Sequence, residues 1–201
     1  MTGGPVPDPS AARHDWAPDP PRPIVPTPAS MSGALRGRRV LIGLPGLGWR
    51  GDLRADEKVV QGSRTYVPVM PEAEWYRAEA EQTEVFAPLV PVERVWVEEY
   101  GLSGLPSDGS DLMSKLVSLD EPARRPAVAA LDAGALTGRR VVQLLDSGKE
   151  QRDLRAVTEM HTSDDGDICI RIATELDWYR WGWSGKTPRT LEVPVHKVWL
   201  E

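Results

Sequence analysis

Apolar and polar residues alternate with the period of β-strands in several parts of this chain. Isoleucine occupies every second position from Ile168 to Ile172, and Leu191, Val193 and Val195 repeat the alternation near the end. Turns between such strands are predicted where Gly, Asp, Ser or Pro gather, at 45–51, 146–149, 163–166 and 182–188. The pattern predicts a mainly β protein made of short strands.

The sequence also repeats itself. Four blocks recur in the same order, with a two-residue insertion in the second copy: GALRGRRV as GALTGRRV, DLRA as DLRA, EWYR as DWYR, and VPV as VPV. Such a repeat indicates two copies of one domain. We place the copies at 33–100 and 134–201 and expect a small closed barrel in each, because so few short strands would otherwise leave open sheet edges.

The segment before the first copy differs in character. Residues 1–32 are rich in proline and polar side chains, which predicts a disordered arm with polyproline II character. Pro20, Pro21, Pro23 and Pro26 have the PxxP spacing of segments that dock into aromatic grooves, and a plain extended tail is the alternative.

Residues 101–133 connect the two copies. Ser110 and Asp111 are a plausible N-cap for an apolar run with helical spacing that ends at Pro122, and a second apolar run, AVAALDAG, begins after Pro126. We therefore expect a linker with two short helices that pack against the barrels or bridge them.

The Val-Pro-Val blocks predict a device that closes each barrel. Because proline fixes φ, it is expected to end one strand and to begin a single 3₁₀ turn, after which the chain reverses into a last strand. The order resembles the C-terminal half of SH3-type barrels, in which an acidic-Trp-aromatic strand, a turn, an apolar-Pro pair, a 3₁₀ turn and a final strand follow one another. The resemblance covers about residues 74–98 and 177–201.

The resemblance implies where a ligand would lie. It places Trp75 and Trp178 in an exposed groove together with Pro91 or Pro194, with the following tyrosines pointing inward. However, an Arg or a Lys stands where the family has a groove tyrosine, and neither copy opens with the family's Ala-Leu-Tyr-Asp-Tyr pattern. These departures favour the barrel over a proline-peptide groove, and they leave a core role open for both tryptophans.

The two copies are not equivalent in their aromatic residues. Trp181 and Trp183 follow Trp178 in the second copy, and the three indoles are predicted to share one face of a strand. In the first copy, Pro68 interrupts the matching alternation, which predicts an edge strand or a bulge. A binding surface is therefore expected on the second copy, where indoles would suit a peptide or a partner protein. Alternatively, these rings cover the other copy or the linker.

Charge and composition limit the class of partner. The net charge is −6 and neither copy is basic, which disfavours binding driven by nucleic-acid phosphates. Paired arginines at 38–39 and 139–140 start predicted strands, where they are typical of solvated gatekeepers. A single cysteine, no signal-peptide pattern and no long apolar run indicate a cytoplasmic protein without a membrane span.

The sequence lacks the residue groups on which catalysis depends. Of the three histidines, His14 lies in the arm, and His161 and His196 have no histidine counterpart in the first copy. Cys169 lies on a predicted strand, where a buried structural thiol is expected. No Cys and His residues have metal-ligand spacing, and the glycines at 43–48 lack the Lys and Ser/Thr of a phosphate-binding loop. We predict no catalytic site, no metal site and no cofactor.

Three hypotheses for function follow. The first is a non-catalytic protein-interaction or adaptor module, with Trp178, Trp181, Trp183 and Pro194 of the second copy, and Trp75 and Pro91 of the first, as partner-binding residues. The second is a single-stranded nucleic-acid-binding protein that uses aromatic residues on the barrel surface. The third is a structural accessory subunit of a larger assembly. Three indoles in one open cleft would favour the first hypothesis, whereas three buried indoles would favour the third.

Overall fold

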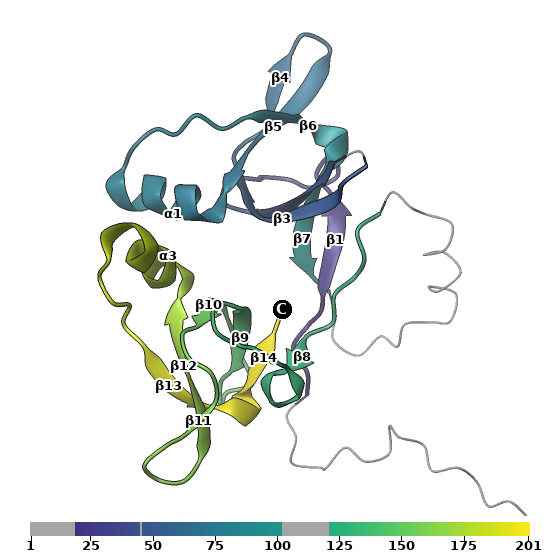
Figure 1. The fold of residues 1–201 in the computed structure, drawn as a ribbon. Helices are drawn as coiled ribbons and strands as arrows, with labels where there is room; N and C mark the ends of the chain where they lie inside the picture. Colours follow the sequence, from purple (N-terminus) through teal and green to yellow (C-terminus); the bar gives the residue numbers. More distant parts are fainter. Residues whose placement is uncertain (1–18, 45, 102–120) are drawn as a thin grey trace, which may run out of the picture.

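The computed structural model describes residues 19–44, 46–101 and 121–201, and in these residues the chain is mainly β. It forms two curled antiparallel sheets, one from each copy, and each sheet carries one helix on the same side of the molecule (Figure 1). The C-terminus lies between the two sheets.

The same elements follow one another in the two copies. The first copy contains β1 (Ile24–Pro28), β2 (Arg39–Leu44), β3 (Gly48–Ala55), β4 (Val59–Gln61), β5 (Arg64–Pro71), α1 (Glu72–Glu81), β6 (Leu89–Pro91), the 3₁₀ turn η2 (Val92–Arg94) and β7 (Val95–Tyr100). The second contains β8 (Val128–Ala129), the 3₁₀ turn η3 (Ala130–Asp132), β9 (Arg140–Leu144), β10 (Glu150–Ala156), β11 (His161–Thr162), β12 (Ile168–Thr174), α3 (Glu175–Ser184), β13 (Leu191–Pro194), the 3₁₀ turn η4 (Val195–Lys197) and β14 (Val198–Leu200).

Strand order confirms that the copies share one topology. The first sheet runs β1-β7-β2-β3-β5-β4 with β6 on β5, and the second runs β8-β14-β9-β10-β12-β11 with β13 on β12. The two cores are built from equivalent residues: Val40 and Val141, Leu53 and Leu154, Ala55 and Ala156, Val67 and Ile170, Val69 and Ile172, and Val95 and Val198. By strand register, one of the two extra residues of the second copy lies between β10 and β11 and the other in the hairpin between β11 and β12.

The Val-Pro-Val blocks have the predicted conformation. Pro91 and Pro194 have φ of −53° and −56°, and each is followed by a three-residue 3₁₀ turn. The chain then enters β7 or β14, which pairs with β2 or β9. Proline thus ends one strand and starts the turn into the last one, as its fixed φ requires.

The prediction of a disordered arm is wrong for residues 24–28, which form β1 on the edge of the first sheet. This strand pairs with β7 from Ile24 opposite Tyr100 to Pro28 opposite Trp96, and Ile24 is buried. An edge strand bonds a neighbour on one side only, so it tolerates the prolines that made the segment look unstructured. Residues 1–18 lie outside the described residues.

The prediction of a helix in AVAALDAG is also wrong, because that segment forms β8 and the turn η3. Ala129 pairs with Trp199, and Ala130 is fully buried in the second core. The equivalent residues of the first copy are Pro28, which pairs with Trp96, and Ala29, which is fully buried. Pairing with β14 at the sheet edge therefore stabilises this segment more than the helix propensity of an alanine-rich run would. The other predicted linker helix lies almost entirely in residues that the structure does not describe.

The acidic-Trp-Tyr-Arg blocks form helices and not the predicted strands. In α3, the side chain of Thr174 accepts a hydrogen bond from the backbone N–H of Asp177, and Gly185 ends the helix in the left-handed region. A threonine followed three residues later by an acidic residue is a helix-start signal. Trp75 and Trp178 thus lie on helices and not on the groove strand that the SH3 resemblance implied.

Pro68 does not make β5 an edge strand, contrary to that part of the prediction, but the ladder beside it is irregular, because the register shifts by one residue between the Ala55–Val69 and Val59–Tyr66 pairs. That strand pairs with β3, β4 and β6, and its Val67 and Val69 are buried like the matching isoleucines. At the equivalent place in β12, the backbone N–H of Arg171 donates to the side chain of Thr158 and not to a neighbouring strand. The proline therefore removes a donor that the ladder does not use.

Candidate functional site

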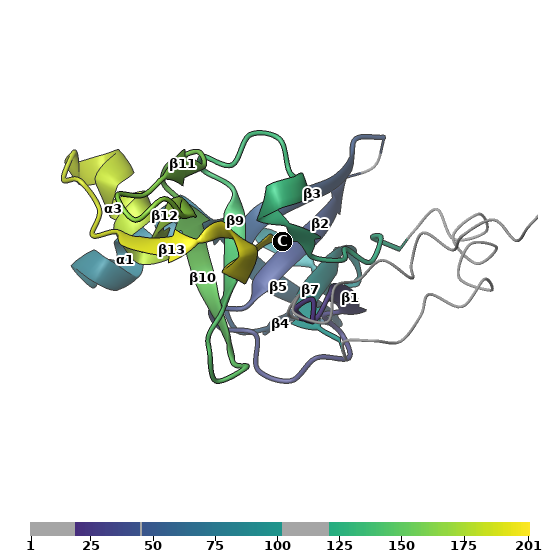
Figure 2. The ribbon, with the colours of Figure 1, turned by 90° about the horizontal axis from the view of Figure 1, so that it is seen from below.

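The two copies meet through α1 and α3, which lie side by side at one end of the molecule (Figure 1 and Figure 2). Tyr76 and Tyr179 occupy equivalent positions on these helices, and their rings stack with centroids 5.3 Å apart. Each tyrosine hydroxyl donates to a carboxylate of the opposite copy, Tyr76 to Glu175 and Tyr179 to Glu72, at 2.9 Å in both cases. The contact is therefore reciprocal, like that of a two-fold symmetric dimer.

Two fully buried carboxylates are the centre of this interface. Glu72 and Glu175 are the first residues of α1 and α3, and each meets arginines from both copies. A guanidinium nitrogen of Arg54 lies 3.0 Å from a carboxylate oxygen of Glu175, and the same atoms of Arg155 and Glu72 are 3.0 Å apart. The two ion pairs are equivalent, and each joins one copy to the other. Arg39 bonds both carboxylates, at 2.9 and 2.5 Å.

The charges of this cluster compensate one another. Burial alone would raise the pKa of Glu72, but the guanidinium groups of Arg39, Arg54 and Arg140 outweigh it and hold the pKa below its ordinary value. Burial and the nearby Glu175 carboxylate raise the pKa of Tyr76, so its phenol remains a hydrogen-bond donor. The interface is thus a buried network of ion pairs and charged hydrogen bonds.

Sequence reasoning missed this network. Arg39 and Arg140 were expected to be solvated, but both are buried, and Arg140 contacts Glu98 and Asp52 of the first copy. Asp52 and Asp153 have φ of 55° and 59° at the strand irregularities of β3 and β10, and each carboxylate meets arginines of the other copy. The sequence contained one signal of this network, the Arg-Arg pair that is present in both copies. Solvated arginines have no physical reason to be kept in both.

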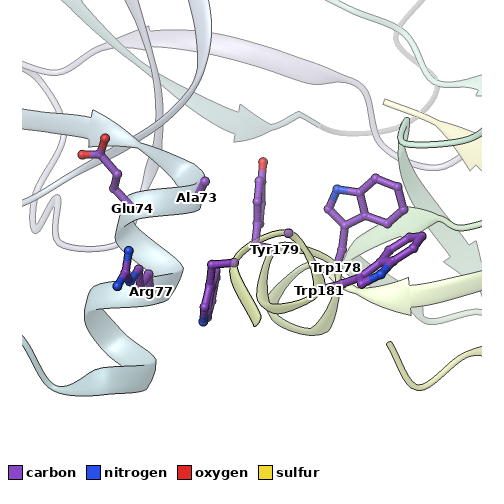
Figure 3. Close-up of a pocket in the computed structure, with 8 residues that line it drawn as sticks. Ala73, Glu74, Arg77, Trp178, Tyr179 and Trp181 are labelled. Carbon is purple, nitrogen blue, oxygen red and sulfur yellow. The ribbon is translucent and has the colours of Figure 1, made fainter. Parts of the chain in front are cut away.

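The helix α3 borders a hollow that Gly182 helps to line. A Cβ added at Gly182 would meet nothing within 4 Å. Trp178 and Tyr179 lie one helical turn earlier, and Trp181 and Trp183 lie on either side of the glycine in the sequence. These five residues and Ala73, Glu74 and Arg77 of α1 line a space of about 390 Å³ (Figure 3). We call this space the Gly182 hollow.

The Trp178 ring packs against Trp181 and Gly138. Trp178 and Trp181 pack edge to face with centroids 5.5 Å apart, and the Trp178 ring lies over Gly138, where an added Cβ would be 3.5 Å from it. Trp75 covers Gly37 in the same manner in the first copy. Both of these tryptophans are half-buried, so each packs its helix on its own sheet, whereas Trp181 remains 39% exposed.

The structure brings together part of the predicted binding set. Trp178, Trp181 and Trp183 line one open hollow, but on a helix and not on a strand face. Pro91 and Pro194 pair with Tyr66 and Cys169 in the sheets, and neither they nor Trp75 line the Gly182 hollow. Sequence reasoning missed Gly182 and Tyr179 because α3 was expected to be a strand, and it missed the residues of α1 because they meet α3 only through the pairing of the two copies.

The equivalent place in the first copy differs in chemistry. Ala78, Glu79 and Ala80 of α1 correspond to Trp181, Gly182 and Trp183 of α3. Glu79 is ion-paired with Arg36 at 3.0 Å, and the Arg36 guanidinium lies over the Trp75 ring, 5.6 Å from its centroid. The counterpart of Arg36 in the second copy is Thr137.

Residues considered for catalysis lie away from the Gly182 hollow. Cys169 is buried on β12, as the sequence predicted, and His161 forms an exposed pair with Glu192. In the described parts of the chain, no group of three or more His, Cys, Asp or Glu side chains is placed to hold a metal ion. Among the same residues, no helix has the length and apolar character needed to span a bilayer. Comparison of the chain with protein-family models, curated proteins and solved structures gave no match.

Proposed function

We propose that this chain is a non-catalytic protein-interaction module made of two fused SH3-like barrels, and that the Gly182 hollow binds a side chain of a partner peptide. The barrel assignment is supported by the path β2, β3, β5, β6, 3₁₀ turn, β7, in which β7 returns to pair with β2. The second copy follows the same path.

One observation carries the proposed function. Four aromatic rings and Gly182 of α3 line the hollow, and two of these rings, Trp181 and Trp183, stand where the matching helix has Ala78 and Ala80. Fold maintenance does not explain the two added rings, because α1 packs on its own sheet without them. Partly exposed tryptophans beside a small open hollow are typical of the few residues that dominate binding energy at protein interfaces.

The surroundings of the hollow favour binding without a large rearrangement. The helix α3 is capped at both ends, and its first residue, Glu175, is fixed by arginines of both copies. The opposite wall belongs to α1, which the same network holds through Glu72. A site built on rigid elements loses little conformational entropy when it binds a partner.

The proposal is tested by a substitution, Gly182→Leu, that fills the hollow without removing an aromatic ring. The full-length protein is used to select peptides from a displayed random library, and the affinity of the selected peptides is measured for Gly182→Leu and for Glu79→Leu, the matched change on α1. We expect Gly182→Leu to weaken binding at least tenfold while Glu79→Leu binds like the wild type. The proposal is wrong if the selected peptides bind Gly182→Leu as tightly as the wild type, or if no peptide is selected.

A further inference from the structure

A second cavity lies in the second copy and shares no lining residue with the Gly182 hollow. It holds about 220 Å³ and is bordered by β9, β10, β12, the first turn of α3 and the segment that leads into β13. Pockets for drug-sized ligands usually measure about 300–1000 Å³, so this space suits a group of the size of one side chain. We call it the Gln143 cavity.

Gln143 is a buried polar residue in the wall of this cavity. It is 8% exposed, and its side-chain carbonyl oxygen accepts no hydrogen bond from the residues that the structure describes. Its neighbours in the wall, Leu154 and Ile172, belong to the second core and have no polar side-chain group. A buried acceptor without a donor costs free energy, because it has lost its hydrogen bonds to water. The amide of Gln143 therefore calls for a partner that the fold itself does not supply.

The first copy shows that the fold does not require an amide at this place. The counterpart of Gln143 is Ile42, which packs against the first core. Three further lining residues are polar where the first copy is apolar, because Pro71, Phe86 and Ala87 are replaced by Thr174, Arg189 and Thr190. The polar residues of the Gln143 cavity thus distinguish the second copy without being needed for the shared fold.

The charged groups of the cavity leave one cation without a partner. Asp177 lines the cavity, but its carboxylate pairs with Arg180 at 3.4 Å. Arg189 is exposed, and its side chain forms no ion pair with any residue in the described part of the chain. The cavity therefore combines a cationic donor, Arg189, with a buried acceptor, the oxygen of Gln143.

These two groups restrict the chemistry of a ligand. A carboxylate could accept from Arg189, but it has no donor for the Gln143 oxygen. An ammonium or guanidinium group could donate to Gln143, but it has no acceptor and would be repelled by Arg189. A primary amide carries a donor and an acceptor on separate atoms of one planar group, so it can bond both side chains at once.

We propose that the Gln143 cavity binds a primary amide, whose NH₂ donates to Gln143 and whose oxygen accepts from Arg189. The terminal torsion of a glutamine is soft, so its rotation can turn the buried oxygen toward the ligand. The amide is the end of a glutamine or asparagine side chain, either of the free amino acid or of a partner segment. This site is independent of the Gly182 hollow and does not rest on the function proposed for it.

The chemistry of the ligand is tested with three probes of nearly the same shape. Propionamide, propionate and butanone carry NH₂, O⁻ and CH₃ on the same carbonyl carbon. Each is titrated into the full-length protein, and the side-chain amide signals of Gln143 and the backbone signal of Thr190 are followed in ¹H–¹⁵N NMR spectra. We expect propionamide to bind about tenfold more tightly than the other two, because each of them leaves a buried group unpaired. Equal binding of the three would overturn the proposal, and so would unchanged signals with propionamide, which would show that the cavity takes only water.

The source of the amide is identified by a second set of titrations. Free glutamine and asparagine are compared with the tripeptides Gly-Gln-Gly and Gly-Asn-Gly, and glutamate and Gly-Glu-Gly serve as controls without the amide. Tighter binding of the free amino acids supports a small-molecule ligand, and tighter binding of the tripeptides supports a partner segment. Acids that bind as tightly as the amides would contradict the proposal.

Exchange of residues between the copies tests the role of Gln143. Gln143→Ile should abolish the response of Thr190 to propionamide and raise the urea midpoint of the ligand-free protein, because it replaces an unpaired buried amide with an apolar side chain. Ile42→Gln is the matched reverse change and should lower the midpoint. A lower midpoint for Gln143→Ile would show that the amide is already satisfied within the protein, and the proposal would be wrong.

Two further variants keep the test independent of protein stability and of the Gly182 hollow. Arg189→Met changes an exposed residue, so it should weaken propionamide severalfold while the urea midpoint stays the same, and undiminished binding would contradict the role of Arg189. Gly182→Leu should leave propionamide binding unchanged, because the two spaces share no lining residue. The two proposals can therefore fail separately.

Discussion

Tyr76 and Tyr179 stack at the junction of the two copies, and each donates its hydroxyl to the buried carboxylate at the start of the opposite helix. This exchange makes each copy part of the other's hydrogen-bond network. The protein therefore has the interface of a symmetric dimer within one chain, and both walls of the Gly182 hollow depend on it.

Loss of one central carboxylate should destabilise the whole protein. Glu175→Gln leaves Arg39, Arg54 and Arg155 with less negative charge in a buried site, so we expect a loss of about 3–5 kcal/mol in the free energy of unfolding. Urea denaturation followed by tryptophan fluorescence and by circular dichroism measures it.

The exposed pair of Arg36 and Glu79 provides the comparison. Glu79→Gln should change the free energy of unfolding by less than about 1 kcal/mol, because exposed ion pairs contribute little. Equal effects of the two substitutions would show that the central network is not the stabilising contact between the copies.

Stability should fall in acid because of Glu72. Its pKa is lower in the folded protein than the ordinary value of 4.5, so its contribution to stability is complete above that value and is lost as the pH falls through the lower, folded pKa. Urea midpoints measured between pH 7 and pH 3 should decline most steeply below about 4.5. In Glu72→Gln this part of the decline should be absent, and an unchanged pH profile would contradict the assignment.

Two glycines near Trp178 should respond to alanine in opposite directions. Gly182→Ala adds a methyl group in open space on a helix, so we expect stabilisation of up to about 1 kcal/mol. Gly138 has φ of +83° and lies under the Trp178 ring, so Gly138→Ala should destabilise by about 1 kcal/mol or more. Thermal unfolding of both variants measures this, and a lower melting temperature for Gly182→Ala would show that the hollow is not open.

Local patterns predicted much of the fold. The repeated blocks predicted the duplication, and Pro91 and Pro194 predicted the 3₁₀ turns. The alternation of Ile168 to Ile172 predicted a strand in which Ile170 and Ile172 are indeed buried, although Ile168 is 51% exposed. Each of these depends on the backbone preferences of a few neighbouring residues. The helix α3 was mistaken for a strand because the aromatic residues suggested a sheet face, although Thr174 and Asp177 have the spacing of a helix cap.

The interface and the hollow could not be predicted from local patterns. Whether Arg39 meets solvent or Glu175 depends on how the two copies pair, and no short segment contains that information. Gly182 looked like part of a turn, because it lines a hollow only when its segment is a helix and α1 lies opposite. The difference between Arg36 and Thr137 was visible in the repeat, but its meaning required the position of the Trp75 ring.

The most direct test of the account is the response of the indole N–H signals in a two-dimensional ¹H–¹⁵N NMR spectrum when a selected peptide is added. We predict that the signals of Trp178, Trp181 and Trp183 on α3 shift. The signals of Trp49, Trp75, Trp96 and Trp199 should stay in place. A shift of the Trp75 signal, or unchanged signals from Trp178, Trp181 and Trp183 with the peptide bound, would contradict the Gly182 hollow as the binding site.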